Sequence, residues 1–235
     1  MNSRTADFGE QDILYEDNHL IVVNKKPSEI VQGDKTGDMP LSETIRLFLK
    51  EKYHKPGNVF LGVTHRLDRP VSGAVLFAKT GKALARINER IRKRELHKVY
   101  WAVVKEPPSK NRGHLVHFLT KDQARNMSFA HASDGPGRQR AELDYQVLGK
   151  SDRYCLLEIL LHTGRHHQIR VQLSQIGCPV KGDLKYGFDR PNKNGSIHLH
   201  AKTLSFLHPV KNEKITIHAP PPPDPLWEFF AANYG

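Results

Sequence analysis

The sequence predicts an α+β protein with a mixed, mainly antiparallel sheet flanked by helices and loops. Three observations support this class: predicted strands outnumber predicted helices, neighbouring strands are often separated by hairpin-length turns, and no internal repeat or linker interrupts the 235 residues. Domains average roughly 150 residues, with wide variation. We therefore expect residues 1–12 to form a tail and residues 13–235 to form a single domain.

Short apolar, β-branched runs bounded by turn residues predict the strands. Residues 13–25 predict two short strands separated by a break at 16–19, and the second of them includes the apolar run 20–23. The other predicted strands are 59–63, 74–78, 97–104, 143–148, 154–161, 202–206 and 214–217. The stretch 106–140 is rich in Gly, Asn and basic residues and predicts hairpins and loops.

Apolar residues at helical spacing predict three helices, 41–53, 82–96 and 168–176. The second is amphipathic, with an apolar face turned inward and a basic face turned outward. Its outward basic residues are Arg86, Arg90, Arg92, Lys93 and Arg94. After an extended stretch at 220–225, residues 226–230 predict a last helical turn that packs back on the body.

The positive charge of the chain is concentrated in its middle third. The formal net charge is +11, and residues 61–140 carry 17 Lys and Arg against 6 Asp and Glu, while the flanking stretches are nearly balanced. Such a concentration is typical of a surface that binds a polyanion, and RNA or DNA is favoured over lipid because the basic stretch lacks an aromatic face. A solvated basic face without a partner is the alternative.

Composition also indicates the compartment. No apolar run approaches the roughly 18 residues of a membrane span, and the N-terminal residues lack the features of a secretory leader. Two cysteines, Cys155 and Cys178, are too few for a disulfide framework. We therefore expect a soluble cytoplasmic protein without membrane contact, and a monomer by default.

Known metal and cofactor motifs are missing. His162 and His166 are four residues apart, but no Glu follows the first, and His198 and His200 have no Cys pair or acidic third ligand nearby in sequence. Neither a phosphate-binding glycine motif nor a serine nucleophile elbow occurs. We therefore expect no cofactor and no metal site.

One segment, residues 65–73, indicates chemistry. It reads H-R-L-D-R-P-V-S-G and places Asp68 between Arg66 and Arg69 in a turn between two predicted strands. Flanking guanidinium groups favour an ionised carboxylate, which suits a nucleophile or an electrostatic stabiliser. The alternative is an ordinary turn aspartate that pairs with its neighbours.

The same segment resembles the H-R-L-D-x-x-T-S-G signature of the RluA-like family of pseudouridine synthases, with Val71 in place of the usual Thr. Residues 98–100 resemble the K-x-Y motif of this family, and residues 163–170 resemble T-G-R-x-H-Q-I-R. Further likeness occurs at 13–25, 177–187, 199–201 and 208–209, so the resemblance covers nearly the whole chain. Only about a dozen residues precede this likeness, so we expect the form without an N-terminal RNA-binding domain.

The resemblance implies a pseudouridine synthase fold and the isomerisation of uridine in structured RNA, either ribosomal or transfer RNA, to pseudouridine without a cofactor. It implies that Asp68 is the essential catalytic residue, that Tyr100 stacks on the target base, and that Arg165 pairs with Asp68. The substrate-binding residues that it implies are His65, Arg66, Lys98, His167, Ile169, Arg170 and Leu199. The basic helix would contact the RNA backbone. The alternatives are a non-catalytic RNA-binding protein that keeps the fold and a metal-dependent hydrolase.

Overall fold

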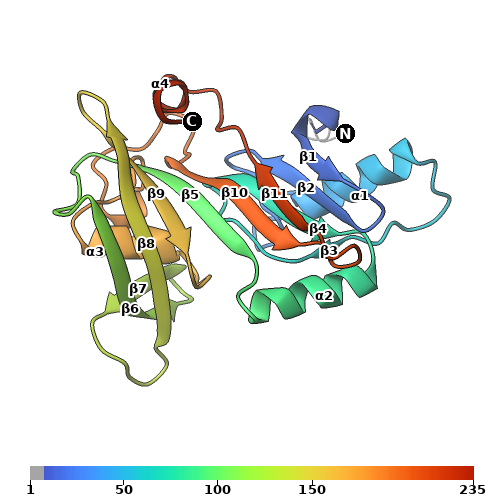
Figure 1. The fold of residues 1–235 in the computed structure, drawn as a ribbon, viewed down its shortest axis with the longest axis horizontal. Helices are drawn as coiled ribbons and strands as arrows, with labels where there is room; N and C mark the ends of the chain where they lie inside the picture. Colours follow the sequence, from blue (N-terminus) through green and yellow to red (C-terminus); the bar gives the residue numbers. More distant parts are fainter. Residues whose placement is uncertain (1–7) are drawn as a thin grey trace. The chain divides into compact units, whose positions relative to one another are not determined.

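The computed structural model describes residues 8–235, which divide into two compact units. The first unit contains the chain up to residue 96 together with 203–220, and the second contains 97–202 together with 221–235. The units have strands and helices of their own (Figure 1), so the predicted α+β class is confirmed. The expected single domain over 13–235 stays a prediction.

The strand pairs described here for the sheet of the first unit are antiparallel. Its central strand is β4 (Ser72–Ala78), which pairs with β2 (Leu20–Lys25) and with the short β3 (Gly62–Val63). Strand β1 (Ile13–Glu16) extends the sheet beyond β2, and β11 (Lys214–His218) pairs with β10 (Leu199–Leu207), which runs from the second unit into the first. All seven residues of β4 are buried, so this strand is covered on both faces.

Two helices complete the first unit, α1 (Leu41–Lys52) and α2 (Gly81–Arg92). Ile87 of α2 joins a core cluster with Leu20, Leu76 and Phe206, which come from three strands. Each such side chain contributes roughly 1.5–3 kcal/mol when it is fully buried. This packing holds β4, the strand that follows the loop at 64–71.

The second unit has an antiparallel sheet in the order β5-β9-β8-β6-β7. The strands are β5 (His97–Val104), β6 (Arg112–Asp122), β7 (Met127–His131), β8 (Gln139–Lys150) and β9 (Cys155–Leu161). Helix α3 (Gln168–Gln175) contacts β6 and β7, while α4 (Pro225–Tyr234) packs Trp227 and Phe230 on Trp101 and Leu156. Short 3-10 turns occur at Glu10–Asp12 in the first unit and Leu184–Tyr186 in the second.

Several helices and strands begin or end at other residues than the sequence predicts. The helix expected over 82–96 begins at Gly81, behind the N-cap Thr80, and ends at Arg92. Lys93 and Arg94 therefore lie beyond it, and Arg94 adopts a left-handed conformation with φ 61°. The reason is tertiary, because Leu96 must enter the core and the chain must turn into β5.

The stretch 106–140 forms hairpins, as expected, but β6 and β8 are 11 and 12 residues long. The strand expected at 59–63 is reduced to two residues, and the final helical turn is a ten-residue helix, α4. In the part of the chain that the structure describes, no helix has the length and apolar character needed to cross a membrane.

Candidate active site

Asp68 lies in the first unit, in the loop that joins β3 to β4. Buried Leu67 anchors the loop, and the backbone N–H of Val71 donates to the carbonyl oxygen of Asp68 at 3.0 Å, which closes a turn. His65 accepts a hydrogen bond at Nε2 from the backbone N–H of Leu76, at 3.2 Å. Asp68 itself is half-buried.

Lys25, at the end of β2, supports this loop and was missed by the sequence analysis. Its side chain is 1% exposed, and its Nζ donates to the carbonyl oxygens of Lys26, Arg69 and Val71 at 2.9, 3.1 and 2.6 Å. Burial lowers the pKa of Lys25 to about 7, against the attraction of the carboxylates of Glu29 and Asp68. A signal was available: this lysine lies two residues after the apolar run 20–23 and precedes a Lys-Pro turn.

The two arginines beside Asp68 have different surroundings. The guanidinium of Arg69 binds Asp38 at 2.6 Å and Thr36 Oγ1 at 2.7 Å, and it lies 3.5 Å from Asp34. Arg66 is exposed. The charge of Arg69 is thus paired with the acidic loop at 34–38. The expectation that the flanking guanidinium groups keep Asp68 ionised stays a prediction.

Tyr100 and Lys98 lie in the second unit, two residues apart on β5, opposite Ile159 and Leu161 of β9. Alternate residues of a strand share a face, so the two side chains project from the same side of the sheet. Tyr100 is buried, and desolvation lowers the pKa of Lys98 to about 8. A lysine with such a pKa exchanges a proton more readily near neutral pH than an exposed lysine does.

The motif at 163–170 forms the entry to α3 in the second unit. Gln168 Oε1 accepts from Thr163 Oγ1 at 2.8 Å and from the backbone N–H of Arg165 at 3.0 Å. His167 has φ 53°, is buried, and its Nδ1 lies 2.7 Å from the hydroxyl of Tyr186. The Arg165 side chain is exposed, and its Nε donates to the carbonyl oxygen of Arg140 at 3.1 Å.

Arg170 has a structural partner. Its guanidinium makes a two-point ion pair with Asp183, Nε to Oδ2 at 2.7 Å and Nη2 to Oδ1 at 2.9 Å, and both side chains are almost completely buried. The ring of Tyr186 lies 5.0 Å from the guanidinium carbon. This pair fastens α3 to the turn at 184–186, whereas the expected substrate contact of Arg170 stays a prediction.

The apolar residues implied as pocket walls are buried in the second unit. Ile169 is 5% exposed and Leu199 is 3% exposed. Burial of this degree is compatible with core packing and with lining a pocket, so their expected role stays a prediction.

Most of the expected RNA-backbone residues make ion pairs or hydrogen bonds within the first unit. Arg86 donates to the carbonyl oxygen of Pro209, Arg90 pairs with Glu95, and Lys93 pairs with Glu89. Arg92 and Arg94 are exposed. These two are the best-placed of the five residues for phosphate contact.

The predicted site residues are thus divided between the units. Asp68, His65, Arg66 and the basic helix belong to the first, and Tyr100, Arg165 and the remaining substrate-binding residues belong to the second. The expected pairing of Arg165 with Asp68 joins the two units and stays a prediction.

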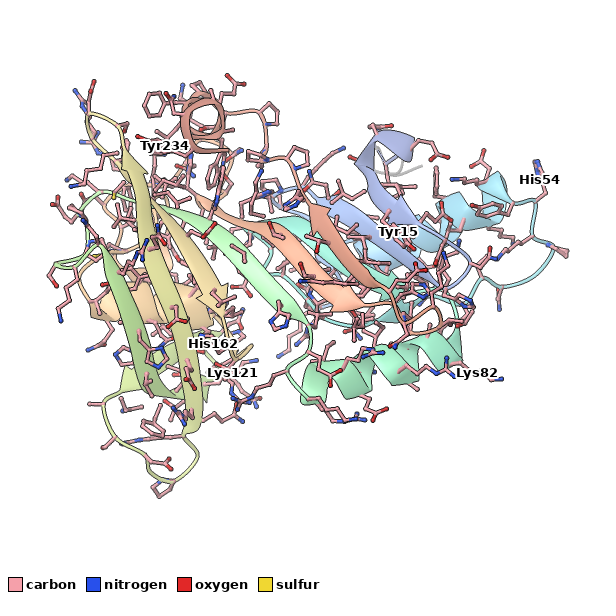
Figure 2. All side chains as sticks on the ribbon, viewed as in Figure 1. Tyr15, His54, Lys82, Lys121, His162 and Tyr234 are labelled. Carbon is pink, nitrogen blue, oxygen red and sulfur yellow. The ribbon has the colours of Figure 1, made fainter. Side chains whose placement is uncertain are left out.

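The histidine spacings considered in the sequence do not converge on a common ligand position. His166 contacts Ser128 and Asn126 at 2.8 and 3.1 Å, whereas His198 contacts Asp224 at 3.1 Å and stacks on Trp227. His162, which is labelled in Figure 2, instead lies against Asp144 at 2.7 Å.

Solved structures define the class of this fold. The structure titled Human RNA Pseudouridylate Synthase Domain Containing 1 superposes with a TM-score of 0.71 at 25% sequence identity, over 94% of this chain and 89% of that one. Human RNA Pseudouridylate Synthase Domain Containing 4 superposes with a TM-score of 0.77 at 22% identity, over 95% and 93%. The chain therefore has the pseudouridine synthase fold.

Sequence comparisons give the family. The family model described as RNA pseudouridylate synthase matches residues 19–175. Uncharacterized RNA pseudouridine synthase YhcT of Bacillus subtilis is 31% identical over 226 residues, which cover 95% of this chain and 72% of the relative. Ribosomal large subunit pseudouridine synthase C of Buchnera aphidicola is 33% identical over 215 residues, 88% of this chain and 66% of the relative. Ribosomal large subunit pseudouridine synthase D of Zymomonas mobilis is 32% identical over 224 residues, 91% and 70%.

The chain belongs to the RNA pseudouridylate synthase family and is an RNA-modifying isomerase. The resemblance to RluA-like enzymes inferred from the motifs is confirmed.

Proposed function

We propose that this chain converts a uridine in a structured RNA to pseudouridine, with the Asp68 carboxylate as the catalytic group. The observation that supports it most is the loop around Asp68, which is closed by a turn and tied to buried Lys25 through two of its carbonyl groups. A carboxylate on such a rigid loop is presented in a defined position, which favours reaction with a bound sugar.

The reaction breaks the N-glycosidic bond, turns the uracil, and joins its C5 to the same ribose carbon, with loss of the C5 proton. Asp68 either attacks the anomeric carbon or removes the ribose 2′ proton, and both routes return the carboxylate at the end. Tyr100 would stack on the uracil and assist the removal of the C5 proton, since a phenol offers an apolar ring and a proton-relaying hydroxyl. Arg165 would pair with Asp68 and hold it ionised.

The proposed substrate is an RNA stem-loop from which the target nucleotide is flipped at a cost of a few kcal/mol. Arg66 would take the vacated place in the stack, because a guanidinium plane stacks well on bases. Ribosomal RNA is the first substrate to test, since two of the relatives are named as ribosomal large subunit enzymes. Transfer RNA is the second. The protein would act in the cytoplasm as a monomer.

The test is tritium release from RNA labelled at uracil C5, with the unmodified protein and the Asp68→Asn variant. Because C5 must lose its hydrogen, release reports the reaction without knowledge of the site. We expect release by the unmodified protein, a loss of at least about a thousandfold in Asp68→Asn, and nearly unchanged RNA affinity. Asp152→Asn, at an exposed position in the second unit, is the matched control and should keep full activity.

The competing function is RNA binding without catalysis. It predicts that neither the unmodified protein nor Asp68→Asn releases tritium from ribosomal or transfer RNA, although both proteins bind RNA. Full activity of Asp68→Asn would instead assign the chemistry to another residue.

A further inference from the structure

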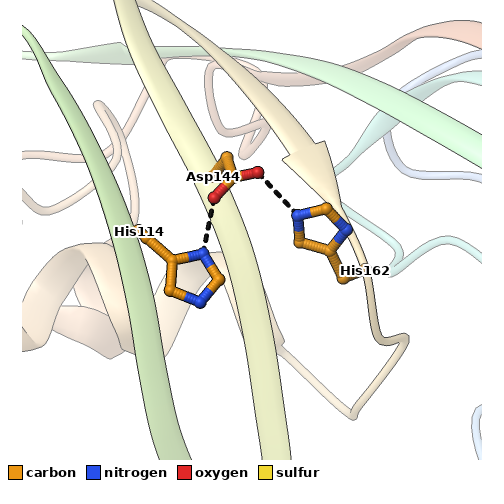
Figure 3. Close-up of side chains that lie close together, drawn as sticks. All are labelled: His114, Asp144 and His162. Atoms are coloured by element: carbon orange, nitrogen blue, oxygen red, sulfur yellow. Dashed lines mark hydrogen bonds and ion pairs between the residues drawn. The ribbon is translucent and has the colours of Figure 1, made fainter.

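Three side chains of the second unit meet on one face of its sheet. Asp144 of β8 lies between His114 of β6 and His162, the first residue after β9 (Figure 3). Asp144 Oδ1 is 2.6 Å from Nδ1 of His114, and Oδ2 is 2.7 Å from Nε2 of His162. One ligand atom from each residue fits within a span of 4.8 Å. Three side chains that can act as cation ligands are therefore clustered within the second unit.

Strand pairing creates this cluster. His114 stands directly opposite Asp144 in the β6–β8 register, and Asp144 stands opposite Leu160 in the β8–β9 register. The backbone N–H of His162 donates to the carbonyl oxygen of Glu142 at 3.1 Å, which keeps the end of β9 against β8. The three positions are thus set by backbone hydrogen bonds and need no loop rearrangement.

A second carboxylate orients one of the imidazoles. Glu142 lies two residues before Asp144, and its Oε1 is 3.3 Å from Nε2 of His114, while its Oε2 is 3.2 Å from Arg140. Metal-binding histidines usually donate the N–H of their second ring nitrogen to a carboxylate, which fixes the tautomer. When a metal ion replaces the proton shared with Asp144, Glu142 would hold the remaining proton at Nε2, and His114 Nδ1 would present its lone pair to the ion.

The charge of the group also suits a cation. Asp144 brings a carboxylate whose two oxygens face one imidazole nitrogen each. Two imidazole nitrogens and one carboxylate oxygen are a ligand set that Zn²⁺ accepts, with the fourth position left to water. The cluster is partly exposed, so a metal ion can enter from solvent.

We propose that His114, Asp144 and His162 form a binding site for a divalent transition metal, with Zn²⁺ as the first candidate and Glu142 as the outer partner of His114. This site goes beyond the pseudouridylation proposed above, and it departs from the expectation of no metal. The ion links strands β6, β8 and β9, so it stabilises the second unit. Any proton shared between an imidazole and Asp144 passes to solvent when the metal binds.

The experiment is equilibrium dialysis of the full chain, free of affinity tags, against ZnCl₂ up to about 100 µM, with the melting temperature recorded in parallel. We expect one bound zinc per chain and a higher melting temperature in zinc than in chelator. Asp144→Asn and His162→Gln should each weaken binding by at least about tenfold, and Glu142→Gln should weaken it by about tenfold. His131→Gln, at a half-buried histidine of neighbouring β7, is the control and should bind as the unmodified protein does.

Folding of each variant is checked by its melting temperature in chelator, and the two imidazoles are followed by NMR. Zinc should shift the ring signals that disappear in His114→Gln and His162→Gln, a result that does not depend on enzymatic activity. The proposal is overturned if the unmodified protein binds no zinc in this range. It is also overturned if the Asp144→Asn/His162→Gln double variant binds zinc as tightly as the unmodified protein.

Discussion

The buried ammonium of Lys25 donates a hydrogen bond of 2.6 Å to the carbonyl oxygen of Val71, three residues after Asp68. A second hydrogen bond, of 3.1 Å, reaches the carbonyl of Arg69. The lysine at the end of β2 thus binds two backbone acceptors of the loop, and the Arg69 carbonyl also accepts from the backbone N–H of Ser28 at 2.8 Å. We infer that Lys25 is a positioning residue: by holding these carbonyl groups, it fixes the loop that carries the Asp68 carboxylate.

Replacement of Lys25 by Met tests this role. Met keeps the apolar stem but removes the ammonium that binds the buried carbonyl of Val71, so the free energy of unfolding should fall by about 1–3 kcal/mol. Tritium release should fall by about tenfold or more, because small displacements of a reacting group are costly, while RNA affinity changes little. Lys50→Met, at an exposed position of α1, is the control. An unchanged rate in Lys25→Met would show that Asp68 does not depend on this support.

The ion pair between Arg170 and Asp183 should be essential for stability of the second unit. Asp183→Asn removes the charge of the carboxylate that this buried guanidinium binds at two points, and breaking a buried ion pair typically costs about 3–5 kcal/mol. Urea unfolding measures the loss. Asp189→Asn is the control, because that aspartate is exposed and lies 3.5 Å from Lys105. A loss below about 1 kcal/mol in Asp183→Asn would contradict the structural assignment of Arg170.

His198 should make stability depend on pH. Burial, with the nearby charge of Lys181, lowers its pKa to about 4, against the favourable contact with Asp224. Between pH of about 6.5 and 4 the unfolded chain binds a proton that the folded chain does not, so the free energy of unfolding falls as the pH decreases. The loss is at most about 3 kcal/mol.

His198→Gln isolates this contribution, because glutamine does not titrate. The difference in unfolding free energy between the unmodified protein and the variant should shrink as the pH falls from 6.5 to 4. If the unfolding free energies of the two proteins changed in parallel with pH, the pKa of His198 would be the same in the folded and unfolded chains, and the prediction would be wrong.

Two exposed arginines, Arg92 at the end of α2 and Arg94 just beyond it, should bind RNA through phosphate groups. Arg92→Glu and Arg94→Glu should each weaken RNA binding, and the slope of log affinity against log salt should decrease by about one for each phosphate group that is no longer bound. Fluorescence anisotropy at several salt concentrations measures both quantities. Lys50→Glu, with the same charge reversal on α1, should change neither. A weakening that is independent of salt would indicate a folding defect rather than weaker binding of phosphate.

Much of the fold could be predicted because its signals are local. The strand at 97–104 has the predicted bounds, and the loop around Asp68 lies between two strands as expected. Alternation and turn residues carry this information within a few positions of the chain. The end of α2 could not be predicted, since it is determined by the burial of Leu96 and the path into β5.

The sequence by itself determined the α+β class, the position of Asp68 in a turn, and the motifs by which the family is recognised. Only the tertiary structure decided the partners of the charged side chains. Lys25 reaches a carbonyl 46 residues away, and Arg69 turns to Asp38. His114 meets Asp144 across 30 residues because β6 and β8 pair in one register. Charged and polar groups pair by proximity in space, and that proximity depends on strand register and packing rather than on spacing along the chain.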